Sequence, residues 1–399
     1  MPSLTRVMIL YCGQGMTTMV EVYDDGVVKQ TADYLALVDC GGSSDGADNA
    51  VSYVADKIIA AHGTILDLLV ISHQDGDHHS FLGKLSERLD GLGATCDASV
   101  IGGTGWSAAN RKSVEKFVTA MDMDASDLEF NAPKRSDYKH ANQRSELKFV
   151  DAYGDTYIRV LISGLAITGT PDMKKNGSSA MVVVENGSYS VFLPGDATHQ
   201  TMDVATDIID AKQQLIPHVV GVEIPHHGAL RTSVENYYAS GKVDKFNWDR
   251  INAFAGALSA DRVVASAGLN NKFHHPLDEV ISVFYPWLVT AADHGYRAYV
   301  FEKGGKGNTT PQGWNNFRTT SAADCTIRRY DQKAGTYTYG DIAIRLSQPG
   351  VFTPEEMIQF IPRGQVMVGT GTDDRETVED LVVFAPAPPA PPESPAPGT

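Results

Sequence analysis

The stretch of sequence that decides the fold is residues 65–79, ILDLLVISHQDGDHH. Leu66–Ile71 is predicted to be a buried strand. It runs directly into a loop with five ionisable side chains among the seven residues 73–79, whereas a solvated turn normally needs only one or two polar residues. Because α/β proteins usually assemble their sites on polar loops at a sheet edge, we predict a functional site at the end of this strand.

The histidines of the chain gather at this loop and at two other places. Of the 12 histidines, seven lie in three short segments, and each segment follows a predicted strand: Leu66–Ile71, residues 218–224 or Arg262–Ser266. The seven are His73, His78, His79, His226, His227, His274 and His275. Imidazole nitrogens together with carboxylate oxygens suit zinc, manganese and iron, so these segments predict a metal site.

The loop after Ile71 can serve two metal ions. Alternate residues of an extended turn project the same way, so His73 and Asp75 can face one metal. Asp77 and His78 can then face a second metal.

Two later segments could complete these sites. Asp196 follows the predicted strand Tyr189–Leu193; its two oxygens could bridge two ions, and Gly195 allows close approach. Asp196 could also cap the helix that follows, and the two roles can coexist. At the end of the strand at residues 218–224, either His226 or His227 could complete the shell of the second metal.

The rest of the chain alternates short apolar runs with amphipathic stretches, which is typical of α/β layers. Strands are predicted at Val7–Tyr11, Thr17–Tyr23, Tyr34–Val38, Thr156–Ile162, Ala180–Glu185 and Tyr189–Leu193, and helices at residues 47–62, 108–120, 198–214 and 277–288. Asn186-Gly187, between two of these strands, is a strong hairpin signal.

Composition limits the class of protein. With 33 Lys and Arg against 49 Asp and Glu, the formal charge is −16, which does not suit an avid binder of phosphate backbones unless bound metals reverse the field locally. No apolar run approaches the roughly 18 residues of a membrane span.

The start, MPSLTRVMILYCGQG, lacks the features of a secretory signal, so we expect a cytoplasmic protein. The four cysteines are far apart and are expected to be plain thiols.

Six motifs, in order along the chain, resemble those of metallo-β-lactamase-fold hydrolases, and within that superfamily the chain is similar to the hydrolase domain of ComEC-type DNA-uptake proteins. The motifs are Gly13-Gln14-Gly15, Val38-Asp39-Cys40-Gly41-Gly42, Ser72-His73-Gln74-Asp75-Gly76-Asp77-His78, Leu193-Pro194-Gly195-Asp196-Ala197, Pro225-His226-His227-Gly228, and Ser266-Ala267-Gly268 through Phe273-His274-His275-Pro276. Six ordered motifs rarely arise together by chance, so the resemblance is specific.

The resemblance implies an α/β fold of the αββα sandwich type, with two sheets face to face, helices outside, and a metal site along one edge. Residues 1–304 would form this hydrolase domain. Residues 305–384 would be an accessory segment, either a small β-rich unit or strands that complete the second sheet. Residues 385–399, APAPPAPPESPAPGT, are predicted to be an extended, solvated tail.

The resemblance also implies two divalent metal ions, Zn²⁺ or Mn²⁺. Carried over by motif, the ligands are His73 and Asp75 for the first metal, Asp77 and His78 for the second, Asp196 between them, and His226 or His227 as the last, with His227 preferred. Asp77 would also orient the attacking water or hand a proton to the leaving group.

The chain departs from the superfamily at the first metal. Asp75 stands where most members have a second histidine, although the ComEC-like group often carries Asp there. The usual further histidine is missing near Asn176-Gly177-Ser178-Ser179, which resembles the Asn/Ser motif of the ComEC-like group. The first site is therefore expected to be weak, or to be completed by His275 or water.

Residues beside these motifs are candidates for contact with the substrate. They are His79, Ser178, Ser179, Arg231 and Ser233, with His275 as a candidate for direct catalysis. Each has a structural alternative: His79 could support the loop, Arg231 and Ser233 could begin a helix, and His275 could fix the turn before Pro276.

The leading functional hypothesis is a metal-dependent hydrolase that cleaves phosphodiesters, as a phosphodiesterase or a nuclease acting on DNA or RNA. Paired divalent metals lower the pKa of bound water toward about 7, which supplies hydroxide at neutral pH. One alternative is a hydrolase of a small ester, thioester, lactam or nucleotide, since fold does not fix substrate. Another is a non-catalytic, metal-stabilised binding module whose Pro-rich tail docks a protein partner.

Overall fold

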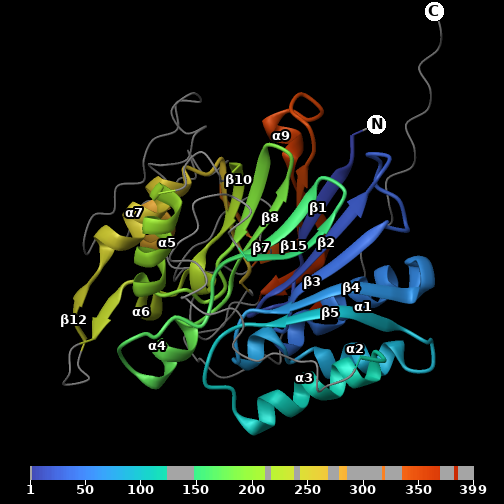
Figure 1. Ribbon diagram of the computed structural model, residues 1–399, viewed down its shortest axis with the longest axis horizontal. Coiled ribbons are helices and arrows are strands. Elements are labelled where there is room, and N and C mark those ends of the chain that lie inside the picture. The colour runs from blue at the N-terminus through green and yellow to red at the C-terminus, as the bar shows by residue number, and fades with distance from the viewer. Residues whose placement is uncertain are drawn as a thin grey trace, which may run out of the picture.

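The computed structural model describes residues 2–123, 148–211, 217–237, 243–267, 278–284, 317–319, 335–368 and 382–384. Its strands form two large sheets that stack face to face, and helices cover the outer face of each sheet (Figure 1). The predicted αββα sandwich is therefore confirmed. In the described part of the chain, no helix has both the length and the apolar character needed to cross a bilayer.

The first sheet contains eight strands in the order β17-β16-β15-β1-β2-β3-β4-β5. Their bounds are β1 Leu4–Ile9, β2 Thr17–Tyr23, β3 Tyr34–Cys40, β4 Ile65–Ile71, β5 Thr95–Ile101, β15 Gly335–Leu346, β16 Ile358–Val368 and β17 Val382–Phe384. β3, β4 and β5 run parallel. Parallel neighbours need crossover connections, which α1 (Ser44–Ala60) and α2 (Leu82–Leu89) provide.

The second sheet contains seven strands in the order β14-β13-β10-β9-β8-β7-β6. Their bounds are β6 Lys148–Tyr153, β7 Thr156–Ile162, β8 Met181–Asn186, β9 Tyr189–Leu193, β10 His218–Glu223, β13 Arg262–Ala265 and β14 Phe317–Thr319. β8 and β9 form the hairpin predicted at Asn186-Gly187. A separate ribbon pairs β11 (Glu235–Tyr237) with β12 (Val243–Phe246).

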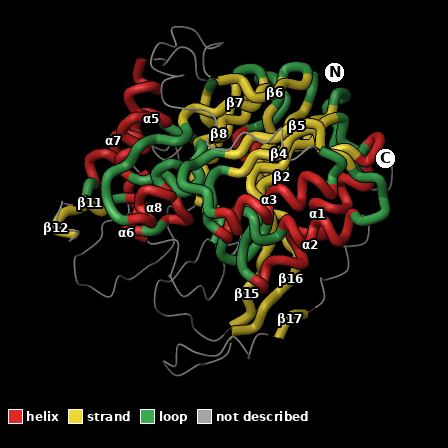
Figure 2. The backbone as a smooth tube through the Cα atoms, turned by 60° about the horizontal axis from the view of Figure 1, so that its bottom comes forward, coloured by secondary structure: helices red, strands yellow, loops and turns green. Residues whose placement is uncertain are grey.

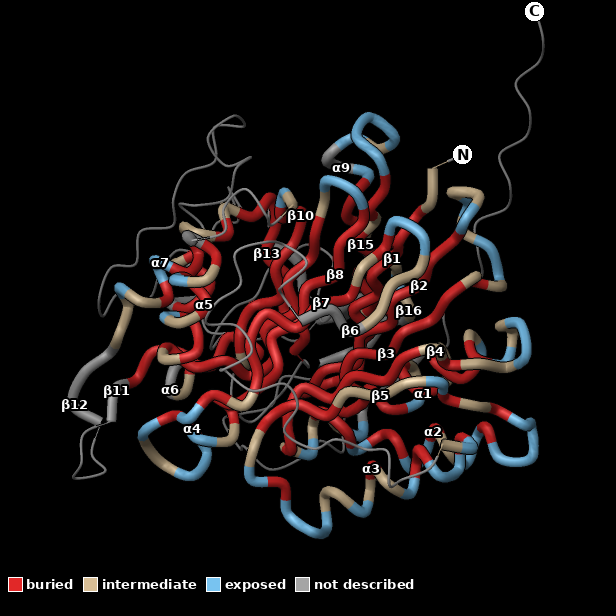
Figure 3. The backbone as a smooth tube through the Cα atoms, viewed as in Figure 1, coloured by how far each residue is buried: buried red, intermediate tan, exposed pale blue. Residues whose placement is uncertain are grey.

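Three apolar layers hold the sandwich together (Figure 3). In β1, Val7 and Ile9 face the second sheet while Met8 faces the helices, as the two-residue period of a strand requires. α1, α2 and α3 (Ala108–Ala120) cover the first sheet, and α5 (His199–Ala211), α7 (Trp248–Leu258) and α8 (Asp278–Phe284) cover the second (Figure 2). The remaining helices are α4 Pro171–Asn176, α6 Leu230–Ser233 and α9 Pro354–Met357.

A strand from the C-terminal part of the chain completes the first sheet. β15 pairs antiparallel with β1, with Ala343 opposite Met8. Ile342, Ile344 and Leu346 are buried in the layer between the two sheets. Residues 335–346 therefore belong to the sandwich itself. Within residues 305–384, β15, β16 and β17 extend the first sheet, and the short strand β14 extends the second. The tail at residues 385–399 lies outside the described residues.

Candidate metal centre

Loops that follow four strands of both sheets meet at one edge of the sandwich. In the first sheet, β3 ends beside Asp39 and β4 leads into residues 72–79. In the second sheet, β9 leads into Asp196 and β10 leads into the turn Pro225–Gly228. Contacts between these loops bring together residues as far as 150 positions apart in the chain, such as Asp77 and His227.

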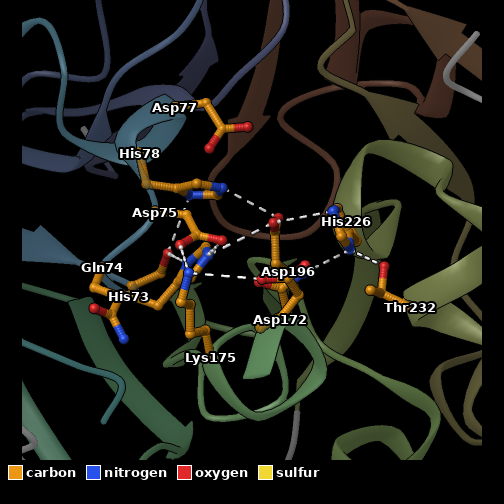
Figure 4. Close-up of polar contacts among 12 residues, drawn as sticks. His73, Gln74, Asp75, Asp77, His78, Asp172, Lys175, Asp196, His226 and Thr232 are labelled. Carbon is orange, nitrogen blue, oxygen red and sulfur yellow. Dashed lines mark hydrogen bonds and ion pairs between the residues drawn. The ribbon is translucent and has the colours of Figure 1, made fainter. Parts of the chain in front are cut away.

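Asp196 lies at the centre, and its two oxygens face different imidazoles (Figure 4). Oδ1 lies 3.1 Å from Nε2 of His78 and 3.6 Å from Nε2 of His227. Oδ2 lies 3.3 Å from Nε2 of His226 and 3.6 Å from Nε2 of His73. A carboxylate with two imidazole nitrogens beside each oxygen can be shared by two metal ions.

A further carboxylate stands beside each pair of imidazoles. Oδ2 of Asp77 lies 3.6 Å from Nε2 of His227, and Oδ2 of Asp75 lies 3.8 Å from Nε2 of His73. We call His73, Asp75 and His226 with Oδ2 of Asp196 the first set, and Asp77, His78 and His227 with Oδ1 of Asp196 the second set. Each set offers two nitrogens and two oxygens.

Unsatisfied buried atoms show that the residues fit metal ions. His73 and His78 are fully buried, and Nε2 of each, like Oδ1 of Asp196, makes no hydrogen bond of good geometry among the described residues. Buried polar atoms normally have such partners. Ligand atoms of His73, His78 and Asp196 lie within 4.8 Å of one another, and so do those of Asp77, His78 and His227. Nitrogen and oxygen donors of this kind suit zinc, manganese and iron.

Asp39 supports two of the imidazoles from behind. Its Oδ2 accepts hydrogen bonds from Nδ1 of His78 and from Oγ of Ser72, each at 2.7 Å, and its Oδ1 accepts one from the Ser72 amide at 2.6 Å. Oγ of Ser72 lies 3.1 Å from Nδ1 of His73. Partners at Nδ1 fix the ring and leave Nε2 to face the metal. The sequence analysis had quoted Asp39 in a motif without giving it a role.

Replacing Asp39 by asparagine is expected to lower metal affinity about 10–100-fold, because one acceptor oxygen of this network becomes a donor. Isothermal titration with Mn²⁺ would measure the change. Asp97→Asn serves as the control, because Asp97 is an exposed residue of β5. This variant should bind Mn²⁺ with the affinity of the wild type. Unchanged affinity in the Asp39 variant would show that the network does not support the ligands.

The backbone of the β10 loop turns both histidines of this loop toward Asp196. His226 and His227 have φ angles of 49° and 53°, in the left-handed region that residues other than glycine rarely adopt. The His226 amide donates to the Gly195 carbonyl at 3.0 Å, which ties the turn to the loop of Asp196. Nδ1 of His227 donates to the Ser266 carbonyl at 3.0 Å. The resemblance had implied one ligand from this pair, but the structure brings both to Asp196.

Asn176 links the side chains of Asp75 and His226. Its side-chain nitrogen, in the orientation that satisfies its neighbours, donates to Oδ2 of Asp75 at 3.0 Å. Its oxygen then lies 3.3 Å from Nδ1 of His226, which also hydrogen-bonds the Thr232 hydroxyl. Asn176 therefore orients two members of the first set. Among the described residues, His226 is the further imidazole beside Oδ2 of Asp196 in this set.

Glycines allow the loop of Asp77 to pack closely against its neighbours. A Cβ atom on Gly41 would lie 2.5 Å from the Asp77 carbonyl, and one on Gly15 would lie 2.6 Å from the same oxygen. The Met16 amide donates to that oxygen at 3.0 Å. The two glycine corners in the resembling motifs therefore fix the backbone of a candidate ligand.

Burial and neighbouring charges divide the four imidazoles into two pairs. Burial, with a smaller contribution from the charge of His78, lowers the pKa of His73 to about 3, and burial also lowers the pKa of His226. Burial disfavours protonation of His78 and His227 as well, but the charge of Asp196 helps to outweigh it and raises both pKa values. Neutral His73 and His226 are therefore ready to act as ligands, whereas His78 and His227 keep their protons to higher pH than these two.

The three carboxylates respond to the same neighbours. Burial opposes the ionisation of Asp77, but its hydrogen bond with His227 and the charge of His78 outweigh this and lower its pKa. Burial likewise opposes the ionisation of Asp196, and the surrounding imidazoles lower its pKa. For Asp75, burial prevails and raises the pKa.

Metal binding is expected to release protons and to strengthen as the pH rises. Because the pKa values of His78 and His227 are raised, both imidazoles are protonated below those values and must each lose the proton at Nε2 before that nitrogen can bind a cation. Calorimetric titrations with Mn²⁺ in buffers of different ionisation enthalpy would count the released protons. Equal binding heats in all buffers would contradict the raised pKa values.

The residues proposed for contact with the substrate make no described contact with Asp196. His79 is buried and its Nε2 donates to the Gln74 carbonyl at 3.0 Å. Ser178 is buried, donates to the Lys175 carbonyl at 2.7 Å and accepts from the Thr104 amide at 2.9 Å. Ser179 is buried. Ser233 is buried and donates to the Pro225 carbonyl at 3.4 Å. The side chain of Arg231 and all of His275 lie outside the described residues.

No family model and no curated protein matches the sequence. Among solved structures, the chain is similar to the metallo-beta-lactamase fold protein YhfI from Bacillus subtilis, with 16% identity over 71% of this chain and 94% of that chain and a TM-score of 0.39. It is also similar to isothiocyanate hydrolase from Delia radicum gut bacteria, with 9% identity, 74% and 95% coverage and a TM-score of 0.37. A third is CmlA, a diiron beta-hydroxylase from Streptomyces venezuelae, with 14% identity, 72% and 49% coverage and a TM-score of 0.37.

Proposed function

We propose that this protein is a metal-dependent hydrolase that cleaves phosphodiesters, as a phosphodiesterase or nuclease acting on DNA, RNA or a nucleotide. The observation that carries the proposal is the convergence of the two ligand sets on opposite oxygens of Asp196. Two divalent metals held by these residues would supply a water of lowered pKa and polarise the bond under attack.

Asp77 is suited to move the proton. Its side chain is 35% exposed, and that of Asp75 is 28% exposed, whereas the imidazoles of His73, His78 and His227 are buried. The site therefore opens to solvent on the side of the two aspartates. Because its pKa is lowered, Asp77 is ionised at neutral pH. It can accept a proton from the attacking water and return it to the leaving oxygen.

Charge favours an anionic substrate at this site. The whole chain carries −16, which would repel phosphates at a distance. At the site, however, two divalent cations held by Asp75, Asp77 and Asp196 would outweigh the negative charge of these three carboxylates, so the sum of these groups would be positive. That charge would attract a phosphodiester and stabilise negative charge that develops on its oxygens. The ComEC-like motifs support the same substrate class.

A substrate panel tests the proposal. Purified protein with Mn²⁺ or Zn²⁺ is incubated with single-stranded DNA, duplex DNA, RNA and a chromogenic phosphodiester, and with carboxylic ester and thioester reporters. Metal-dependent cleavage of at least one phosphodiester is expected. The double variant Asp77→Ala/His78→Ala should lose this turnover while keeping a wild-type circular dichroism spectrum; undiminished turnover would overturn the roles given to these residues.

The panel also separates the alternatives. Cleavage of the ester or thioester alone would indicate a hydrolase of small substrates. Bound metal without turnover of any substrate would indicate a metal-stabilised binding module. Either result would overturn the proposed phosphodiesterase activity.

A further inference from the structure

The two ligand sets differ in how their carboxylates are held. In the second set, Oδ2 of Asp77 lies 3.6 Å from Nε2 of His227, and the ligand atoms of Asp77, His78 and His227 already lie within 4.8 Å of one another. In the first set, both oxygens of Asp75 have other partners. Oδ2 accepts from the Asn176 amide at 3.0 Å, and Oδ1 lies 3.5 Å from Nζ of Lys175.

Lys175 brings a positive charge to the first set. It lies in the last turn of α4, and its side chain is 37% exposed, so the charge is only partly screened by solvent. Figure 4 shows Lys175 reaching toward Asp75 and His73. Its other ion-pair partner, Asp172, lies 3.7 Å away and is 78% exposed, and such exposed pairs contribute little. Asp75 is therefore the better-shielded partner of this lysine.

We propose that Lys175 makes the two metal sites unequal. A cation in the first set must share Asp75 with the ammonium group of Lys175 and is repelled by it, whereas the second set has no lysine or arginine in ion-pair contact among the described residues. At a pH at which all four imidazoles are neutral, the second set therefore fills at lower metal concentration, and the first set exchanges its ion more readily. This inference rests on the proposed metal centre.

The asymmetry has a functional consequence. Since both sites are needed for the proposed chemistry, the concentration of free metal that fills the first set determines how much of the protein is active. Lys175 thereby sets the metal concentration at which the protein becomes active.

Calorimetric titration of metal-free protein with Mn²⁺ tests the proposal without measuring turnover. The wild type is expected to bind two ions in two resolved steps. Asp75→Asn should weaken or remove the weaker step and Asp77→Asn the tighter one, which assigns each step to its set. Lys175→Gln, which removes the charge, should tighten the weaker step about tenfold and leave the tighter step unchanged.

Two matched variants control for effects of the substitution itself. Lys175→Arg keeps the charge and should bind in the same two steps as the wild type. Lys174→Gln removes the charge of the neighbouring residue of α4, which is exposed and forms no ion pair among the described residues; it should also leave both steps unchanged.

Three outcomes would overturn the proposal. They are two steps of equal affinity in the wild type, an unchanged or weakened first-set step in Lys175→Gln, and equal tightening in Lys174→Gln. If the wild type bound no metal at all, the proposed metal centre would fail together with the inference. If it bound two ions but Lys175→Gln had no effect, only the inference would fail.

Discussion

Replacing Asp196 by asparagine should remove both metal ions and abolish hydrolysis. Asp196 faces imidazoles of both sets, with two nitrogens beside each oxygen. An amide offers one oxygen, and its nitrogen cannot be a ligand to a cation. The affinity of both sites should fall by more than the roughly 10–100-fold that loss of an outer hydrogen-bond partner causes. Elemental analysis after desalting would measure the retained metal.

Asp203→Asn is the matched control for this variant. Asp203 lies in α5, the helix that follows Asp196, and its side chain is 51% exposed and paired with Arg250. This variant should retain both metals. If Asp196→Asn lost one metal and kept the other at full affinity, Asp196 would belong to a single site, and the shared-carboxylate arrangement would be wrong.

His226→Ala and His227→Ala should each empty a different site. His226 lies beside Oδ2 of Asp196, and His227 lies beside Oδ1 and Asp77. The His226 variant should therefore keep the second-set ion, and the His227 variant should keep the first-set ion. Each should lower turnover at least about 100-fold, because the proposed chemistry uses both ions.

Combinations of variants sharpen this prediction. His226→Ala combined with Asp75→Asn should be little worse than either change alone, since both act on one site, whereas His226→Ala combined with Asp77→Asn should lose both ions. Calorimetry with Mn²⁺ on the four single variants and these two combinations would give the coupling energies. Loss of the same ion in the His226 and His227 variants would contradict the division into two sets.

Local patterns were enough to predict many of the strands and helices, and the resemblance supplied the sandwich architecture. Thr17–Tyr23 and residues 108–120 were predicted with the bounds that the structure shows, because β-branched runs and helical spacing depend only on neighbours in sequence. The pairing of β15 with β1 was not predicted. The alternation of Ile342, Ile344 and Leu346 indicates a strand, but it does not say which strand lies beside it.

The candidate centre was predicted in part. His73, Asp75, Asp77 and His78 stand out in sequence because they follow one buried strand, and Asp196 stands out because it ends another. That both histidines of Pro225–Gly228 face Asp196 depends on two consecutive left-handed residues, which sequence does not reveal.

Two supporting residues escaped the sequence analysis for different reasons. Asp39 acts through Ser72 and His78, which are 33 and 39 positions away, so no local pattern marks its role. Lys175 lies in α4, a six-residue helix that was not predicted. Thr170-Pro171, an N-cap residue followed by proline at the first helical position, was a usable signal for that helix.

Crystals grown with Mn²⁺ and measured near its absorption edge would test the central claim most directly. We predict two anomalous peaks, one bound by His73, Asp75 and His226 and the other by Asp77, His78 and His227, with Asp196 bound to both. A single peak, or no peak within bonding distance of Asp196, would contradict the account.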